Sequence, residues 1–125
     1  MNLRKALVIS AVALSAACGS SSSTPTTPSN SSVPPSPRTV NIPVGARTLG
    51  AASYVPNPLT IPPGTTVTWT NADTIPHTTT SNTAGVFDSG TMAAGASYSF
   101  TFANRGTFDY HCTFHPGMVA SVTVQ

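Results

Sequence analysis

The chain is organised around the sequence YHCTFHPGM at residues 110–118, close to its end. A thiol, an imidazole and a thioether follow one another within seven residues there, on Cys112, His115 and Met118. Two histidines and a cysteine in a trigonal arrangement, with a weak axial methionine, form a donor set that suits copper. This stretch therefore predicts a metal site that one further histidine, from elsewhere in the chain, would complete.

The residues before the cysteine alternate in the way a β-strand does. Phe108, Tyr110 and Cys112 occupy every second position, so their side chains share one face of the strand. If the two rings point into a core, Cys112 also points inward, and His111 points outward. The thiol would then lie at the inner end of a strand, at the start of a short loop that returns as the last strand.

Similar alternation recurs from Arg38 to the end of the chain, and no segment has a helical period. Turn residues separate the alternating segments at intervals of roughly 8–12 residues. We expect about seven or eight strands, within residues 40–44, 59–61, 65–70, 78–81, 86–87, 98–102, 108–112 and 122–124, while residues 49–54 fit either a short strand or a loop. The pattern predicts an all-β domain over residues 38–125, a Greek-key β-sandwich or barrel.

Aromatic residues are expected to supply much of the core, because a domain of this size buries only about two-thirds of its unfolded surface. The rings at core-facing positions are Trp69, Tyr98, Phe100, Phe102, Phe108 and Tyr110.

His77 is the one histidine outside residues 110–118, and it follows the predicted strand that contains Trp69. Pro76 fixes its own φ and disfavours a helical approach, which stiffens the segment that presents the ring. The candidate metal ligands are therefore His77, Cys112, His115 and Met118. His115 could instead be an ordinary surface histidine, and Met118 could pack at the start of the last strand.

The N-terminus has the features of an export signal. Arg4 and Lys5 precede a short apolar run over residues 6–14, and small residues lead to Cys18. The run is too short to span a bilayer, which takes roughly 20 residues. We interpret residues 1–17 as a signal peptide of the lipoprotein type with Cys18 as the lipidated residue; ordinary cleavage near Ala16 or Ala17 is the alternative.

Residues 18–37 are rich in Ser, Thr and Pro and have almost nothing to bury, so we expect a disordered tether. Its reach is roughly 25–60 Å, depending on how extended it is. The formal charge of +2 becomes zero once Arg4 and Lys5 are removed with the signal, which leaves no basic patch for nucleic acid. A disulfide between Cys18 and Cys112 is possible, but each cysteine has another assignment.

The motif of residues 110–118 resembles that of the blue copper proteins, or cupredoxins, with the short spacing between His115 and Met118 that is typical of the amicyanin type. Upstream sequences agree with the resemblance: IPPG at residues 61–64, VTWTN at 67–71, Pro76-His77, and FDSG at 87–90. The resemblance implies a cupredoxin β-sandwich, one type 1 copper ion, and single-electron transfer between redox proteins, with no enzymatic activity. It also implies that partners dock around His115, Pro116 and Gly117.

Two positions near the expected site depart from the family. Amicyanin and plastocyanin have Asn directly after the first histidine ligand, where Thr78 stands here, and they have Pro where Phe114 stands. We expect the N–H of Thr78 to contact the cysteine sulfur and its hydroxyl to replace part of the missing amide. The N–H that Phe114 adds near the sulfur should raise the reduction potential, because hydrogen bonds to this sulfur tune it.

Other functions stay open at this level. A copper-binding protein for delivery or storage without redox work is the main alternative, and a subunit or sensor in a larger membrane complex is a third. Structural zinc usually takes four strong ligands, which this set lacks. From the export signal we expect the protein in the periplasm or at the cell surface, as a membrane-anchored lipoprotein of bacteria. We also expect a monomer.

Overall fold

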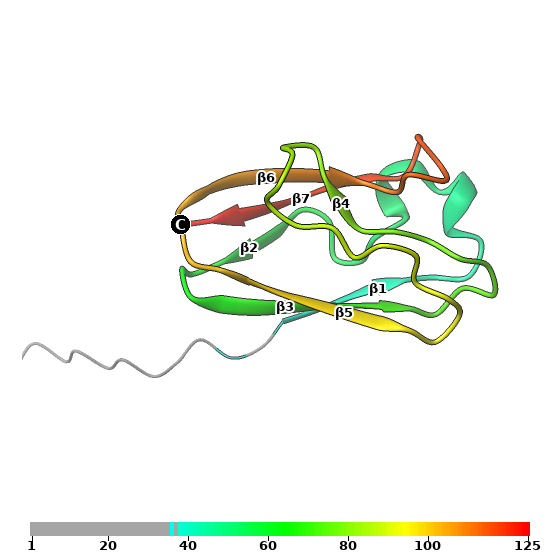
Figure 1. The fold of residues 1–125 in the computed structure, drawn as a ribbon, viewed down its shortest axis with the longest axis horizontal. Coiled ribbons are helices and arrows are strands. Elements are labelled where there is room, and N and C mark those ends of the chain that lie inside the picture. Colours follow the sequence, from blue (N-terminus) through cyan, green and yellow to red (C-terminus); the bar gives the residue numbers. More distant parts are fainter. Residues whose placement is uncertain (1–35, 37) are drawn as a thin grey trace, which may run out of the picture. The chain divides into compact units, whose positions relative to one another are not determined.

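Two β-sheets face each other in the computed structural model, which describes residue 36 and residues 38–125 (Figure 1). The first sheet has the order β1-β3-β5, formed by Arg38–Ile42, Thr65–Asn71 and Ser97–Phe102. The second has the order β2-β7-β6-β4, formed by Leu59–Ile61, Val119–Val124, Gly106–His111 and Thr80–Ser81. These seven strands confirm the predicted all-β sandwich.

The predicted signal peptide, Cys18 and nearly all of the predicted tether lie outside the described residues. Within the described part of the chain, no helix is long and apolar enough to span a membrane.

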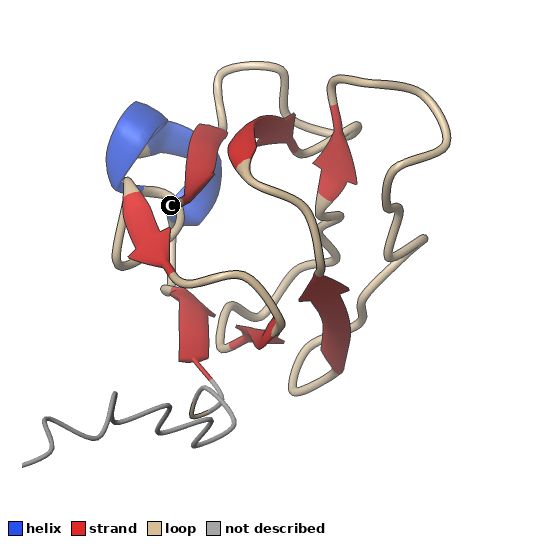
Figure 2. Ribbon diagram, turned by 90° about the vertical axis from the view of Figure 1, so that its left-hand side faces the viewer, coloured by secondary structure: helices blue, strands red, loops and turns tan. Residues whose placement is uncertain are grey.

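Strand pairing is mixed. β1 runs parallel to β3, and β2 runs parallel to β7, while β3 with β5, β4 with β6 and β6 with β7 are antiparallel. Figure 2 views the sandwich from the end that carries the C-terminus, with the strands around the interior. The opposite end, where β3 and β6 finish, is the one that carries the predicted metal ligands.

The core between the sheets is built around Trp69, whose ring lies 5.6 Å from that of Tyr110 and 5.5 Å from that of Phe87. Three of the six expected core rings, on Trp69, Phe102 and Tyr110, are buried. The other three, on Tyr98, Phe100 and Phe108, pack against the core but stay partly exposed. Tyr98 and Phe100 lie on β5, which is an edge strand and is hydrogen-bonded to a neighbouring strand, β3, on one side only.

Three local expectations need correction. Residues 49–54 form neither a strand nor a simple loop, because two 3-10 turns, η1 (Ala46–Thr48) and η2 (Gly50–Ala52), lead to the buried Tyr54. Residues 86–87 form no strand; the carbonyl of Phe87 accepts one hydrogen bond from the N–H of Ser81, at 2.9 Å. The strand expected over residues 78–81 is reduced to β4, because the first half of that segment contacts the candidate site instead.

Candidate metal centre

Residues 112–118 form a loop that is closed by its own backbone. The N–H of Cys112 donates to the carbonyl of Met118 at 3.1 Å, which joins the two ends of the loop. His115 N–H donates to Cys112 at 3.3 Å, and Met118 N–H donates to His115 at 2.9 Å. Three of the four candidate ligands are thus held to one another by main-chain hydrogen bonds, independently of any metal.

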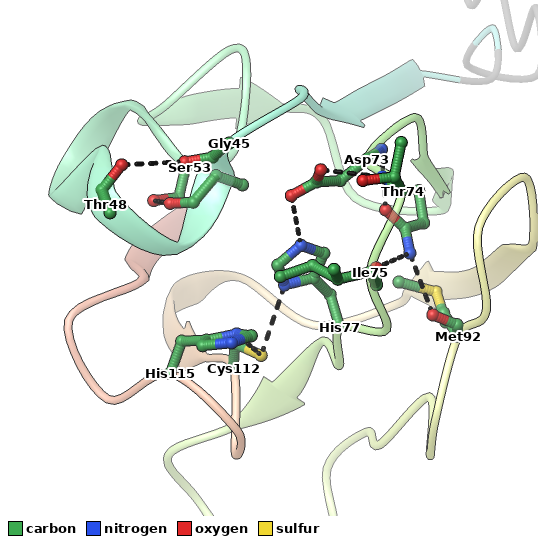
Figure 3. A network of polar contacts seen from close by, with 12 residues as sticks. Gly45, Thr48, Ser53, Asp73, Thr74, Ile75, His77, Met92, Cys112 and His115 are labelled. Atoms are coloured by element: carbon green, nitrogen blue, oxygen red, sulfur yellow. Dashed lines mark hydrogen bonds and ion pairs between the residues drawn. The ribbon is translucent and has the colours of Figure 1, made fainter.

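The donor atoms of Cys112, His77 and His115 lie together (Figure 3). Cys112 Sγ is 3.6 Å from His115 Nδ1 and 3.8 Å from His77 Nδ1, and all three donor atoms lie within 4.8 Å of one another. Nitrogen and sulfur ligands sit roughly 2.0 and 2.3 Å from zinc, an ion of the same row, and a trigonal arrangement of such bonds separates S from N by roughly 3.8 Å. The spacing therefore fits one metal ion bound by all three residues.

Met118 joins this group through its place in the loop. Its side chain is fully buried, although the following residue, Val119, is exposed. A methionine sulfur is a ligand type of blue-copper sites, whereas zinc is bound by cysteine, histidine and carboxylate side chains, so Met118 would favour copper over zinc.

Asn71, the last residue of β3, organises the segment that delivers His77. Its side-chain amide donates to the carbonyls of Ile75 and Met92, each at 2.9 Å, and its oxygen accepts the N–H of Asp73 at 3.0 Å. His77 and Met92 then exchange two backbone hydrogen bonds, of 3.1 and 2.8 Å. Nothing in the sequence connects Met92 with the site, yet its backbone fixes the position of the first histidine.

Asp73 is a functional residue that the sequence reasoning missed. Its Oδ2 lies 2.9 Å from His77 Nε2, so the carboxylate bonds the side of the ring that faces away from Cys112 (Figure 3). The hydrogen bond with His77 lowers the pKa of Asp73 to about 2, against the opposing effect of burial. Histidines that bind metals commonly donate their second N–H to a carboxylate, which fixes the tautomer and raises the basicity of the ligand.

His115 is the partly exposed member of the group. Partial burial lowers the pKa of its ring, and the nearby His77 and Arg47 lower it further. Both effects favour the neutral imidazole that a metal ligand needs. His111, by contrast, points away as the strand alternation predicts, and its Nδ1 lies 2.6 Å from Asn82 Oδ1.

Thr78 links the two segments of the site. Its N–H donates to Cys112 Sγ at 3.3 Å, as expected from the sequence. Its hydroxyl oxygen accepts the N–H of Thr113 at 2.8 Å and the hydroxyl of Thr80 at 3.0 Å. On its other side, the carbonyl of Thr78 accepts the hydroxyl of Tyr54 at 2.6 Å. Thr78 thus connects residues 112–118 to β4 and to the core.

Thr78→Val is expected to destabilise the metal-free protein by about 1–2 kcal/mol, because the N–H of Thr113 loses its acceptor while the side chain keeps its shape. Denaturant unfolding of both proteins measures the difference. Thr78→Ser is the matched control, since it keeps the hydroxyl and should unfold close to the wild type. Equal free energies of unfolding for the valine variant and the wild type would show that the hydroxyl of Thr78 does not stabilise the fold.

Phe114 lies in the same loop with its side chain half exposed. The expected bond from its N–H to the sulfur is not found: among the described residues, Thr78 is the N–H donor to Cys112 Sγ. The geometry of the loop thus gives Phe114 a smaller influence on the sulfur than the sequence suggested.

Phe114→Pro is accordingly expected to lower the reduction potential of the copper-loaded protein only modestly, by less than about 60 mV, the change that corresponds to tenfold in a one-electron equilibrium. The reason is that proline removes the N–H dipole of Phe114 from the loop that begins at Cys112, but takes away no hydrogen bond to the sulfur. Voltammetry of both proteins measures it, and an unchanged or raised potential would contradict the prediction.

Comparison with known proteins agrees with this geometry. The family of copper-binding proteins of the plastocyanin/azurin type matches residues 41–125. The chain belongs to this family, and its fold is that of a cupredoxin.

Three relatives place the chain within the family. Amicyanin from Paracoccus denitrificans is 42% identical over 67 residues, which cover 50% of this chain and 50% of that protein, so the match spans about half the length of the relative. Plastocyanin from Scenedesmus fuscus is 34% identical over 94 residues, covering 61% of this chain and 90% of that protein. The structure of a novel purple cupredoxin from Nitrosopumilus maritimus has a TM-score of 0.66 and 37% identity, over 70% of this chain and 99% of that one.

Proposed function

We propose that this protein carries single electrons between redox partners, with one type 1 copper ion held by His77, Cys112, His115 and Met118. The observation that carries the proposal is the buried thiol of Cys112, with one imidazole nitrogen at 3.6 Å and another at 3.8 Å. Copper, when bound, supplies the Cu(II)/Cu(I) couple. The protein would act as a carrier and not as an enzyme, because four ligand side chains, three of them buried, would surround the ion.

The residues around the site keep the ligands in place during electron transfer. The loop hydrogen bonds, the contact of His77 with Asp73 and the hydroxyl of Thr78 hold the ligand residues through contacts within the protein. Ligands that the protein itself holds in place would need little rearrangement between oxidation states, which favours fast transfer. The same closed set of ligands argues against the alternative, a protein that delivers or stores copper, for which an exposed and exchangeable site would be expected.

The visible spectrum of the protein with Cu(II), followed by voltammetry, tests the proposal. An intense thiolate-to-Cu(II) band with reversible one-electron reduction is expected. Colourless copper, or copper that exchanges readily with a chelator, would instead support delivery or storage. The colour also tests whether Met118 would bind the ion. Blue copper sites have a weak methionine ligand, and one structurally similar cupredoxin is described as purple.

We place the redox partner at the surface around His115. A shallow apolar hollow there is lined by Ile75, Pro76, Phe114 and His115. Pro116 and Gly117 beside it are exposed. A small apolar contact of this kind suits a transient complex, which forms and separates with each electron. The proposed signal peptide and the lipid on Cys18 would hold this monomeric domain at the outside of a bacterial membrane.

Arg47 is an exposed charge close to this surface, where it lowers the pKa of His115 and lines a second hollow with Ile75. Arg47→Gln is expected to slow oxidation of the copper(I) protein by hexacyanoferrate(III), a trivalent anion, by about three- to tenfold at low ionic strength. Oxidation by the cation tris(phenanthroline)cobalt(III) should become faster instead. Stopped-flow traces give both rates, and Arg105→Gln is the control. Equal responses to the two oxidants would exclude electron exit beside Arg47.

A further inference from the structure

Every oxidisable aromatic side chain in the sequence belongs to one continuous cluster. The chain has one tryptophan and three tyrosines, and these are Trp69, Tyr54, Tyr98 and Tyr110. The ring of Tyr110 lies 4.8 Å from Tyr54 and 5.6 Å from Trp69, and the ring of Trp69 lies 6.0 Å from Tyr98. The four rings therefore form a series of direct contacts through the core.

The inner end of this series reaches the metal centre. Tyr110 precedes Cys112 by two residues, so the thiol and the phenol ring are joined by a short stretch of backbone. The indole N–H of Trp69 donates to the hydroxyl of Tyr110 at 3.2 Å, which extends the connection by one hydrogen bond. Tyr54 reaches the site independently, because its hydroxyl bonds the carbonyl of Thr78, whose N–H bonds the sulfur of Cys112.

The outer end of the series reaches the surface. Tyr98 lies on β5, the edge strand of its sheet, and is partly exposed. It is the direct cross-strand partner of Trp69 in the β3–β5 ladder. Cross-strand partners have their Cβ atoms about 4.5–5.5 Å apart, so the contact between the two rings is fixed by the register of the sheet.

Filling the core does not by itself account for these residue types. The hydroxyls of Tyr54 and Tyr110 are hydrogen-bonded and so avoid the cost of burying an unpaired polar group, but phenylalanine would fill almost the same volume without needing such partners. The chain uses phenylalanine at neighbouring core positions such as Phe87 and Phe102. The oxidisable residues instead occupy the continuous line between the candidate site and Tyr98.

We propose that Tyr98, Trp69 and Tyr110 form a path that carries an electron from the metal centre to a strong one-electron oxidant, such as an organic or oxygen-centred radical, at the surface near Tyr98. The protein would then neutralise such radicals at a position that is not among the residues lining the hollow at His115. This inference rests on the proposed function only for its last step, the transfer of an electron from the reduced copper to Trp69.

The electrons and protons balance as follows. The oxidant gains one electron from Tyr98, whose phenolic proton leaves to the solvent. Trp69 gives one electron to the Tyr98 radical, which takes back a proton, and a Trp69 radical cation remains. An electron from the reduced metal centre, carried through Tyr110, restores Trp69. The net result is one reduced oxidant molecule and one oxidised metal centre, which the ordinary electron donor can reduce again.

The first test uses the zinc-substituted protein, because zinc holds the thiolate and has no redox chemistry of its own. Tris(bipyridine)ruthenium(III), generated by a light flash, is the oxidant, and transient absorption with electron paramagnetic resonance identifies the radical. The wild type should yield a tryptophan radical. Tyr98→Phe should lower the rate at which this radical forms by about tenfold or more, because phenylalanine cannot be oxidised in place of Tyr98 and the electron must cross a higher barrier. Phe100→Leu on the same strand should not change this rate. A tryptophan radical that forms equally fast in Tyr98→Phe would overturn the path.

The second test uses the same flash on the copper(I) protein and follows the rise of the visible Cu(II) band. Tyr98→Phe, and separately Trp69→Phe, should slow this rise by a similar factor, while Phe100→Leu leaves it unchanged. A rise that is independent of both substitutions would overturn the path. If the zinc protein behaves as expected but no coloured copper centre can be formed at all, then the proposed function fails and the transfer from Trp69 to Tyr98 stands.

Discussion

Cys112→Ser is expected to abolish the intense visible absorption of the copper-loaded protein and its reversible reduction. Both properties come from a bond between a thiolate and copper, and a serine hydroxyl forms no comparable bond near neutral pH, because bound thiols are deprotonated and alcohols are not. The fold should persist, since the serine keeps nearly the same size in the buried position. Circular dichroism together with the visible spectrum separates loss of the site from loss of the fold.

The neighbouring residue supplies the control for this experiment. His111 is the last residue of β6 and directly precedes Cys112, but its side chain bonds Asn82 on the other face. His111→Gln should therefore keep the band and the redox couple. A serine variant of Cys112 that kept an intense band, or a glutamine variant of His111 that lost it, would show that the ligands have been assigned wrongly.

Asp73→Asn is expected to raise the reduction potential by about 60 mV or more, that is, at least tenfold in the one-electron equilibrium. The carboxylate bonded to His77 Nε2 stabilises the more positive oxidation state and makes the imidazole a stronger donor. An amide of the same shape removes the negative charge, so Cu(I) becomes more stable relative to Cu(II). Asp109→Asn, at an exposed position on β6, is the matched control and should leave the potential unchanged.

The metal-free protein gives this substitution a second readout. The folded protein holds the pKa of Asp73 at about 2, below the ordinary value of 3.8. A lowered pKa contributes stability above the ordinary pKa, and this contribution is lost as the pH falls through the folded value. The free energy of unfolding should therefore drop between about pH 4 and pH 2 in the wild type, and drop less in Asp73→Asn. Parallel curves for the two proteins would mean that the carboxylate and His77 do not interact.

The features that the sequence predicts well are those fixed by strand alternation and by spacing along the chain. The phase of Phe108 and Tyr110 places Cys112 inward, and the proximity of His115 in the loop leaves little freedom for its position. The N–H of Thr78 reaches the sulfur because it follows His77 directly. Each of these relations is local, or depends on a single contact between two loops.

The features that the sequence did not predict depend on tertiary contacts, which leave no periodic pattern of apolar residues in the sequence. Asp73 reaches His77 only because Asn71 bends the intervening residues back, through bonds to Ile75 and Met92. A carboxylate in an irregular segment has no phase from which its direction could be deduced. Tyr54 is similar, since it enters the core at the end of two 3-10 turns and not from a strand.

The contact between His77 and Cys112 joins parts of the chain that are 35 residues apart in sequence. A metal ion shared by these two residues acts as a cross-link, in the way a disulfide does, and closes a long loop of chain. For a loop of this length, the entropy removed from the unfolded chain corresponds to about 4 kcal/mol at room temperature. The ion would thus also join the loop after β6, in the second sheet, to the segment after β3, in the first sheet. Removal of the ion would then make the whole sandwich easier to unfold.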